Sequence, residues 1–159
     1  MTTLYVNDSG NYREACDDEV IRCAQGLLGK RFRAGSPVLT SPARTQEFLR
    51  VRLANLDYEV FGCLYVDKRH RLIKAEDLFR GTIDGATVHP REVVRSVIHH
   101  GAASVVLYHN HPSGQATPSQ ADEIITSRLR DALALIDVRL LDHIIVGDSA
   151  YSFAEHGLI

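Results

Sequence analysis

Two histidines and an aspartate in the last third of the chain have the residue types and spacing to bind a metal ion. His109 and His111 lie two positions apart at the end of the apolar segment Ser104-Val-Val-Leu-Tyr108. In extended backbone, side chains two positions apart point to the same face of the strand. Asp122 follows in the expected first turn of a helix. Two imidazoles and one carboxylate form a three-ligand site of the catalytic kind, which leaves the fourth tetrahedral position for water.

Each of these residues also fits an ordinary structural role. Ser119 and Asp122 have the spacing of a capping box, in which the two residues satisfy backbone amides at the N-terminus of a helix. Asn110 and the segment from Pro112 to Gly114 are typical of a turn. A capping box requires neither histidine, however, and a buried strand seldom ends with two histidines on one face. The pattern by itself leaves metal binding and helix capping open.

The elements that must position these residues follow from apolar periodicity and from Gly, Pro and capping signals. Helices are predicted over residues 17–31, from Pro42 through Leu56, from Pro90 to Gly101 and after Ser119; strands are predicted over 58–66, 71–75, 104–108, 139–146 and 150–153. The first 15 residues are polar, so we expect no regular element there, and 81–87 is predicted as loop or short strand. This order of elements predicts an α/β (α+β) fold with a mixed, mainly antiparallel β-sheet flanked by helices.

Composition limits the class of protein. With 159 residues and 45% hydrophobic residues, the chain fits one domain with a short appendage, large enough to fold without a metal. The formal charge of −2 and the scattered basic residues do not support a nucleic-acid partner. Three cysteines without a CxxC pair indicate reduced thiols, and no segment approaches the ~18 apolar residues of a membrane span. We therefore expect a cytoplasmic protein without a membrane partner.

The longer motif that contains the two histidines resembles that of the RadC family, within the wider MPN/JAMM metalloprotease group. It reads His109-Asn-His-Pro-Ser-Gly-x-x-x-Pro-Ser119-x-x-Asp122. The likeness continues through Val88-His-Pro-Arg-Glu92 and Leu140-Leu-Asp-His-Ile-Ile-Val-Gly147. It implies a RadC-like MPN/JAMM domain over 39–159, preceded by an N-terminal helical extension over 1–38. It further implies a short form of the family, without the helix-hairpin-helix region of longer members.

The resemblance also implies roles for individual residues. JAMM enzymes need a glutamate far upstream, followed by an apolar residue and Gly-x-Leu, and Glu59-Val-Phe-Gly-Cys-Leu64 fits that pattern. By this likeness His109, His111 and Asp122 bind Zn²⁺, Glu59 is the general base, and Ser119 donates a hydrogen bond to the developing oxyanion. Zinc lowers the pKa of a bound water from ~15.7 to about 7, which explains the choice of metal. Without the resemblance, Glu59 fits a surface residue of an edge strand.

The function implied by the resemblance is a zinc metallopeptidase or isopeptidase that acts on a peptide or protein substrate. One alternative is a catalytically inactive metal-binding module for protein interaction, although the full set of matching residues favours activity. Another is a DNA-repair-associated, nuclease-like protein. His109-Asn-His111 spells HNH, but that nuclease motif consists of dispersed residues. His143 could orient a metal ligand, but its position is more typical of a polar residue in a strand.

Overall fold

The structure is a computed structural model that describes residues 3–31, 41–54, 56–81 and 88–159. Within these ranges the elements are β1 (Tyr5–Asp8), β2 (Asn11–Glu14), α1 (Asp17–Arg31), α2 (Pro42–Arg52), β3 (Val60–Val66), β4 (Leu72–Arg80), α3 (Pro90–His100), β5 (Ser104–Asn110), α4 (Gln120–Ala134), β6 (Arg139–Val146) and β7 (Ala150–Ser152). None of the helices in the described ranges has the length and apolar character that crossing a bilayer requires.

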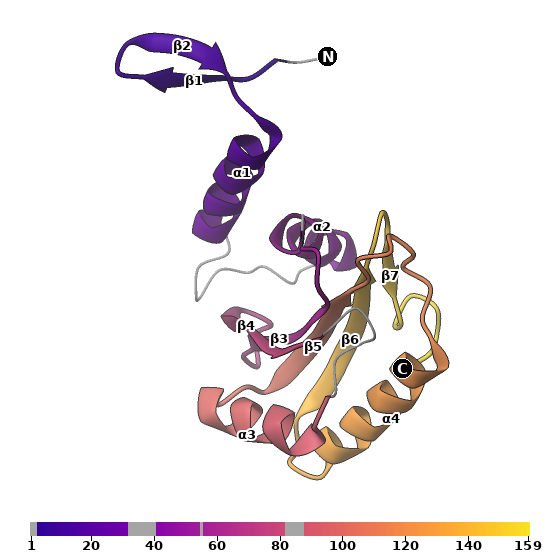
Figure 1. The fold of residues 1–159 in the computed structure, drawn as a ribbon. Helices are drawn as coiled ribbons and strands as arrows, with labels where there is room; N and C mark the ends of the chain where they lie inside the picture. The colour runs from indigo at the N-terminus through magenta and orange to yellow at the C-terminus, as the bar shows by residue number, and fades with distance from the viewer. Residues whose placement is uncertain (1–2, 32–40, 55, 82–87) are drawn as a thin grey trace.

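Five strands form the central sheet, in the order β4-β3-β5-β6-β7 (Figure 1). β3 pairs antiparallel with both β4 and β5, and β6 pairs antiparallel with β7. The contact between β5 and β6 is the parallel one. The predicted mixed, mainly antiparallel sheet is therefore confirmed, and β5, which leads into the histidine motif, is its middle strand.

Helices cover both faces of this sheet (Figure 1). On one face, Phe48 and Leu49 of α2 belong to a buried cluster with sheet residues such as Leu64 and Val106. The opposite cluster joins α3 and α4 to the other side of the same strands, through Val93, Val97, Leu129, Leu133, Cys63, Tyr65 and Leu107. Side chains of a strand alternate between its faces, so every residue of β3 and β5 is buried. A strand held from both sides gives the motif at its end a rigid support.

The N-terminal residues differ from the sequence-based expectation of no regular element. β1 and β2 pair antiparallel, from Tyr5 opposite Glu14 to Asp8 opposite Asn11. Ser9 and Gly10 connect them with φ values of 53° and 96°, the positive values that a two-residue hairpin turn requires. The hairpin is almost fully exposed, so its sequence lacks the apolar alternation that reveals a half-buried strand. α1 then begins at Asp17, as predicted.

Two further strand ends differ from prediction. β4 extends to Arg80 rather than to residue 75, because it pairs with the whole of β3. β5 extends to Asn110, so His109 lies within the sheet rather than in the loop predicted there. This longer β5 matters for the site, because the sheet then fixes the backbone of His109. The predicted loop or short strand at 81–87 falls almost entirely outside the described residues.

We expect Gly62→Ala to destabilise the domain by about 1–3 kcal/mol, because the site of the new methyl group is already filled. Gly62 lies opposite Tyr108 on β5 and Asp77 on β4. The Tyr108 side chain crosses over Gly62 to donate a hydrogen bond to Asp77, and a Cβ at Gly62 would overlap the Tyr108 ring and the carbonyl of Glu76. Urea-induced unfolding measures the loss.

The matched control is Gly26→Ala in α1, where a Cβ meets no atom within 4 Å. Alanine favours a helix interior over glycine by up to about 1 kcal/mol, so this variant should lose no stability. Equal unfolding midpoints for Gly62→Ala and wild type would show that the sheet opens around the added methyl group at no cost.

Candidate metal centre

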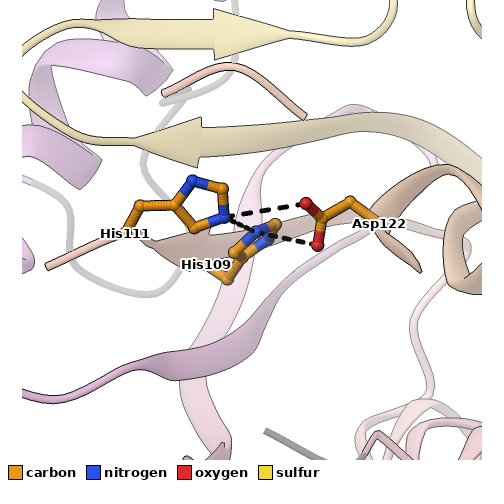
Figure 2. Close-up of side chains that lie close together, drawn as sticks. All are labelled: His109, His111 and Asp122. Atoms are coloured by element: carbon orange, nitrogen blue, oxygen red, sulfur yellow. Dashed lines mark hydrogen bonds and ion pairs between the residues drawn. The ribbon is translucent and has the colours of Figure 1, made fainter. Parts of the chain in front are cut away.

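His109, His111 and Asp122 meet where β5 ends and α4 begins (Figure 2). The Nε2 atoms of His109 and His111 are 2.9 Å apart. The Asp122 carboxylate faces both rings, with 3.2 Å from Oδ1 to Nε2 of His109 and 3.6 Å from Oδ2 to Nε2 of His111. One ligand atom from each residue lies within 4.8 Å of the others, so the group has the convergence needed to hold a metal ion.

The hydrogen bonding of His111 tests whether a cation fits this group. Its Nδ1 lies 2.7 Å from the carbonyl oxygen of Gln115, which can only accept a hydrogen bond. In the neutral ring Nδ1 therefore carries the hydrogen, and Nε2 presents a lone pair toward His109 and Asp122. Because Nε2 of the neutral ring carries no hydrogen, it cannot donate a hydrogen bond to the Asp122 carboxylate or to the His109 ring. A cation satisfies all three groups, so the donor set fits a metal.

Asp122 serves the helix and the site with the same carboxylate. Its Oδ2 accepts hydrogen bonds from the backbone N–H of Ser119 at 2.7 Å and from the Ser119 hydroxyl at 2.6 Å. The Asp122 N–H in turn donates to the Ser119 hydroxyl oxygen at 3.2 Å, which completes a capping box. Helix capping and metal binding, left open by the sequence, are compatible. The cap fixes the carboxylate in the orientation that faces the histidines.

The charges at the site are mutually stabilised. Burial alone would raise the pKa of Asp122, but the hydrogen bonds that His109 and His111 donate when they carry a hydrogen on Nε2 hold it well below its ordinary value. Conversely, a protonated His111 can donate from Nε2 to Asp122, and this hydrogen bond raises the pKa of His111; the negative charge of Glu59 acts in the same direction. The centre therefore keeps an ionised carboxylate beside the two imidazoles, and Glu59 is near enough for its charge to affect His111.

Glu59 lies directly before β3, half-buried, and the side chain of Asn110 holds the backbone on either side of it. The Asn110 Oδ1 accepts from the N–H of Val60 at 2.8 Å, and its Nδ2 donates to the carbonyl of Tyr58 at 2.9 Å. The Glu59 carbonyl also accepts from the N–H of Gly81 at 2.8 Å. Asn110 thus ties the segment of Glu59 to the strand that carries the histidines. The sequence predicted only a turn residue at this position.

Two buried residues behind the centre had no assigned role in the sequence-based prediction. His143, on β6, has its Nε2 2.8 Å from the Nδ1 of His109. Its Nδ1 lies 2.6 Å from the hydroxyl of Thr126, on α4. For His143 the sequence favoured a polar strand residue over a group that orients a ligand, and nothing in the sequence indicated Thr126. Both residues come close to His109 only through the packing of β5, β6 and α4 in the folded domain.

A mixed sheet between helices, with a His-His-Asp group where its middle strand ends, fits a JAMM-like metal-binding fold. The family model described as a RadC-like JAB domain matches residues 39–158. This chain therefore belongs to the RadC-like JAB domain family, as its motifs predicted.

Related proteins support the same assignment. A UPF0758 protein of Thioalkalivibrio sulfidiphilus is 62% identical over 126 residues, which cover 79% of this chain and 56% of the relative. One from Nitrosococcus oceani is 61% identical over 123 residues, covering 77% of this chain and 55% of the relative. One from Vibrio cholerae is 50% identical over 141 residues and 89% of each chain. The chain thus spans about half the length of the first two relatives and most of the third.

Proposed function

We propose that this chain is a zinc-dependent hydrolase domain, a metallopeptidase or isopeptidase that cleaves an amide bond in a peptide or protein. The observation that carries the proposal is the convergence of His109, His111 and Asp122, with the charge of Glu59 acting on His111. Three protein ligands leave a coordination position open, which is typical of catalytic rather than structural zinc sites. Two imidazoles and a carboxylate suit zinc among the common divalent metals.

In this proposal each residue has a separate task. His109, His111 and Asp122 would hold the ion, which supplies Lewis acidity and lowers the pKa of water at the site. Glu59 would take the proton of the attacking water and pass it to the leaving nitrogen. Ser119 is the candidate donor to the oxyanion. Because its single hydroxyl hydrogen bonds to Asp122 here, Ser119 would have to turn away from that carboxylate to act.

A cleft of about 840 Å³ beside His111 offers room for a substrate. It lies between α1, α2 and the loops that follow β5 and β6, and its lining is mixed. Apolar side chains such as Val20 and Val51 share it with polar ones such as Gln46 and Arg50. This composition suits a peptide, which carries apolar side chains on a polar backbone. With a formal charge of −2, the chain is less suited to a nucleic-acid phosphate backbone, which favours peptide over DNA as substrate.

The inactive-module alternative has the same ligands but predicts no turnover, so activity decides between the two. Purified protein saturated with zinc should contain one zinc per chain by elemental analysis, and should cleave members of a random peptide library, read by mass spectrometry. Duplex DNA treated with the same preparation should stay intact. Full zinc occupancy without cleavage of any peptide would favour the interaction module, and cut DNA would favour the nuclease.

A further inference from the structure

A chain of hydrogen bonds runs from the backbone of one candidate ligand to the ring of another. It begins at the carbonyl oxygen of Asp122, which accepts a hydrogen bond from the hydroxyl of Thr126. The Thr126 oxygen lies 2.6 Å from Nδ1 of His143, and Nε2 of His143 lies 2.8 Å from Nδ1 of His109. Thr126, His143 and His109 are each at most 1% exposed, so water does not compete for these contacts.

The carbonyl of Asp122 determines which group donates in every hydrogen bond of this series. A carbonyl oxygen can only accept, so Thr126 uses its single hydroxyl hydrogen on Asp122. The Thr126 oxygen then has only lone pairs to offer, and Nδ1 of His143 must donate to it. A neutral His143 therefore has a bare Nε2, which accepts from Nδ1 of His109. The ring of His109 is left with its lone pair on Nε2, the atom that faces Asp122 and His111.

We propose that Thr126 and His143 are positioning residues that hold His109 in the tautomer with hydrogen on Nδ1, so that its Nε2 is ready to bind a metal. The inference rests on the proposed metal centre, and it deepens it by assigning roles to two residues outside the ligand set. His111 reaches the same tautomer by a shorter route, through the carbonyl of Gln115. Both histidine ligands are thus oriented by backbone carbonyl groups.

Packing around His143 supports a fixed rather than adaptable ring. It stacks on Phe153, with ring centroids 4.9 Å apart, and meets Phe61 edge-on at 5.6 Å. Neighbouring apolar rings prevent His143 from rotating to exchange its two nitrogens. Ring orientation and hydrogen-bond direction are therefore determined together, which is the arrangement that commonly supports a histidine ligand of a metal.

Nitrogen-15 NMR of histidine-labelled protein tests the tautomers directly, because protonated and bare ring nitrogens differ in chemical shift. We expect His143 and His109 to carry hydrogen on Nδ1 in the metal-free chain at mildly alkaline pH, and His143 to keep it there after zinc is added. Hydrogen on Nε2 of His143 in either state would overturn the proposal. This measurement needs no substrate and no activity.

A pair of substitutions at Thr126 separates hydrogen bonding from packing. Thr126→Val keeps the shape but removes the hydroxyl, so it should weaken zinc binding ~10–100-fold and release His143 from its single tautomer. Thr126→Ser keeps the hydroxyl and should bind zinc within about threefold of wild type. Ser127→Ala removes a hydroxyl that contacts only Arg130 in the hydrogen bonds of the described residues, and serves as the matched control on α4. Chelator competition gives the affinities.

Wild-type zinc affinity in Thr126→Val, or equally weak binding in Thr126→Ser and Thr126→Val, would contradict the role of the hydroxyl. If Thr126→Val does not fold, the tautomers of wild type and the affinity of Thr126→Ser still decide the matter. The two proposals also fail separately. A chain that binds zinc with the expected tautomers but cleaves no peptide refutes only the hydrolase function, whereas an active chain with hydrogen on Nε2 of His143 refutes only the positioning role.

Discussion

The His111→Ala variant should lose zinc and activity together while its fold stays intact. Removal of a ligand should lower zinc affinity by more than about 100-fold, because even changes behind the ligands commonly reduce it ~10–100-fold. The His111 side chain is 21% exposed and lies beyond the end of β5, outside the hydrophobic clusters that join helices to sheet. Far-ultraviolet circular dichroism should therefore match that of wild type, and elemental analysis should find the metal gone.

Thermal unfolding with and without zinc gives a second measurement. A ligand that binds only the native state stabilises it by RT ln(1 + [L]/Kd), about 2.7 kcal/mol at 100 times Kd. Zinc should raise the Tm of wild type and leave that of His111→Ala unchanged. His99→Ala, which removes an exposed histidine from α3, is the control and should behave as wild type. Global unfolding of His111→Ala would instead show that the site is structural.

The sequence predicted the sheet and the site more fully than it predicted the residues behind the site. Buried strands such as β5 are short apolar segments, and α3 has Pro90 at its start and Gly101 at its end. Both kinds of element could therefore be predicted from the local sequence. His109, His111 and Asp122 lie within one motif of 14 residues, so their convergence depends on one strand, one turn and one helix start.

His143 and Thr126 depend instead on long-range assembly. β5 and β6 are parallel, and their register places His143 opposite Leu107, two positions before His109 on the same face. A shift of one residue would turn His143 to the opposite face of the sheet. No local pattern determines that register, so the contact between His143 and His109 could not be derived from spacing. The exposed hairpin from Tyr5 to Glu14 was missed for another reason, since only its Ser9-Gly10 turn marks it.

Glu59→Gln should abolish most activity while the metal stays bound, because Glu59 is proposed to accept a proton and not to bind the ion. Glutamine has nearly the same size but cannot accept the proton of the attacking water. Loss of a general base typically lowers the rate ~10²–10⁴-fold, so kcat/KM on a library-derived peptide should fall by that factor. Zinc affinity should remain within about threefold of wild type, since the proposed ligand set has no member from β3 or the segment before it.

The position of Glu59 makes this variant a clean test. The Asn110 side chain accepts from the Val60 N–H and donates to the Tyr58 carbonyl, and neither bond involves the Glu59 side chain, so the substitution leaves that support unchanged. Asp57→Asn, which removes an exposed carboxylate two residues earlier, is the matched control and should keep full activity. The decisive comparison is with His111→Ala. If Glu59→Gln releases zinc as readily as His111→Ala does, Glu59 is a ligand, and the separation of metal binding from proton transfer proposed for this centre is wrong.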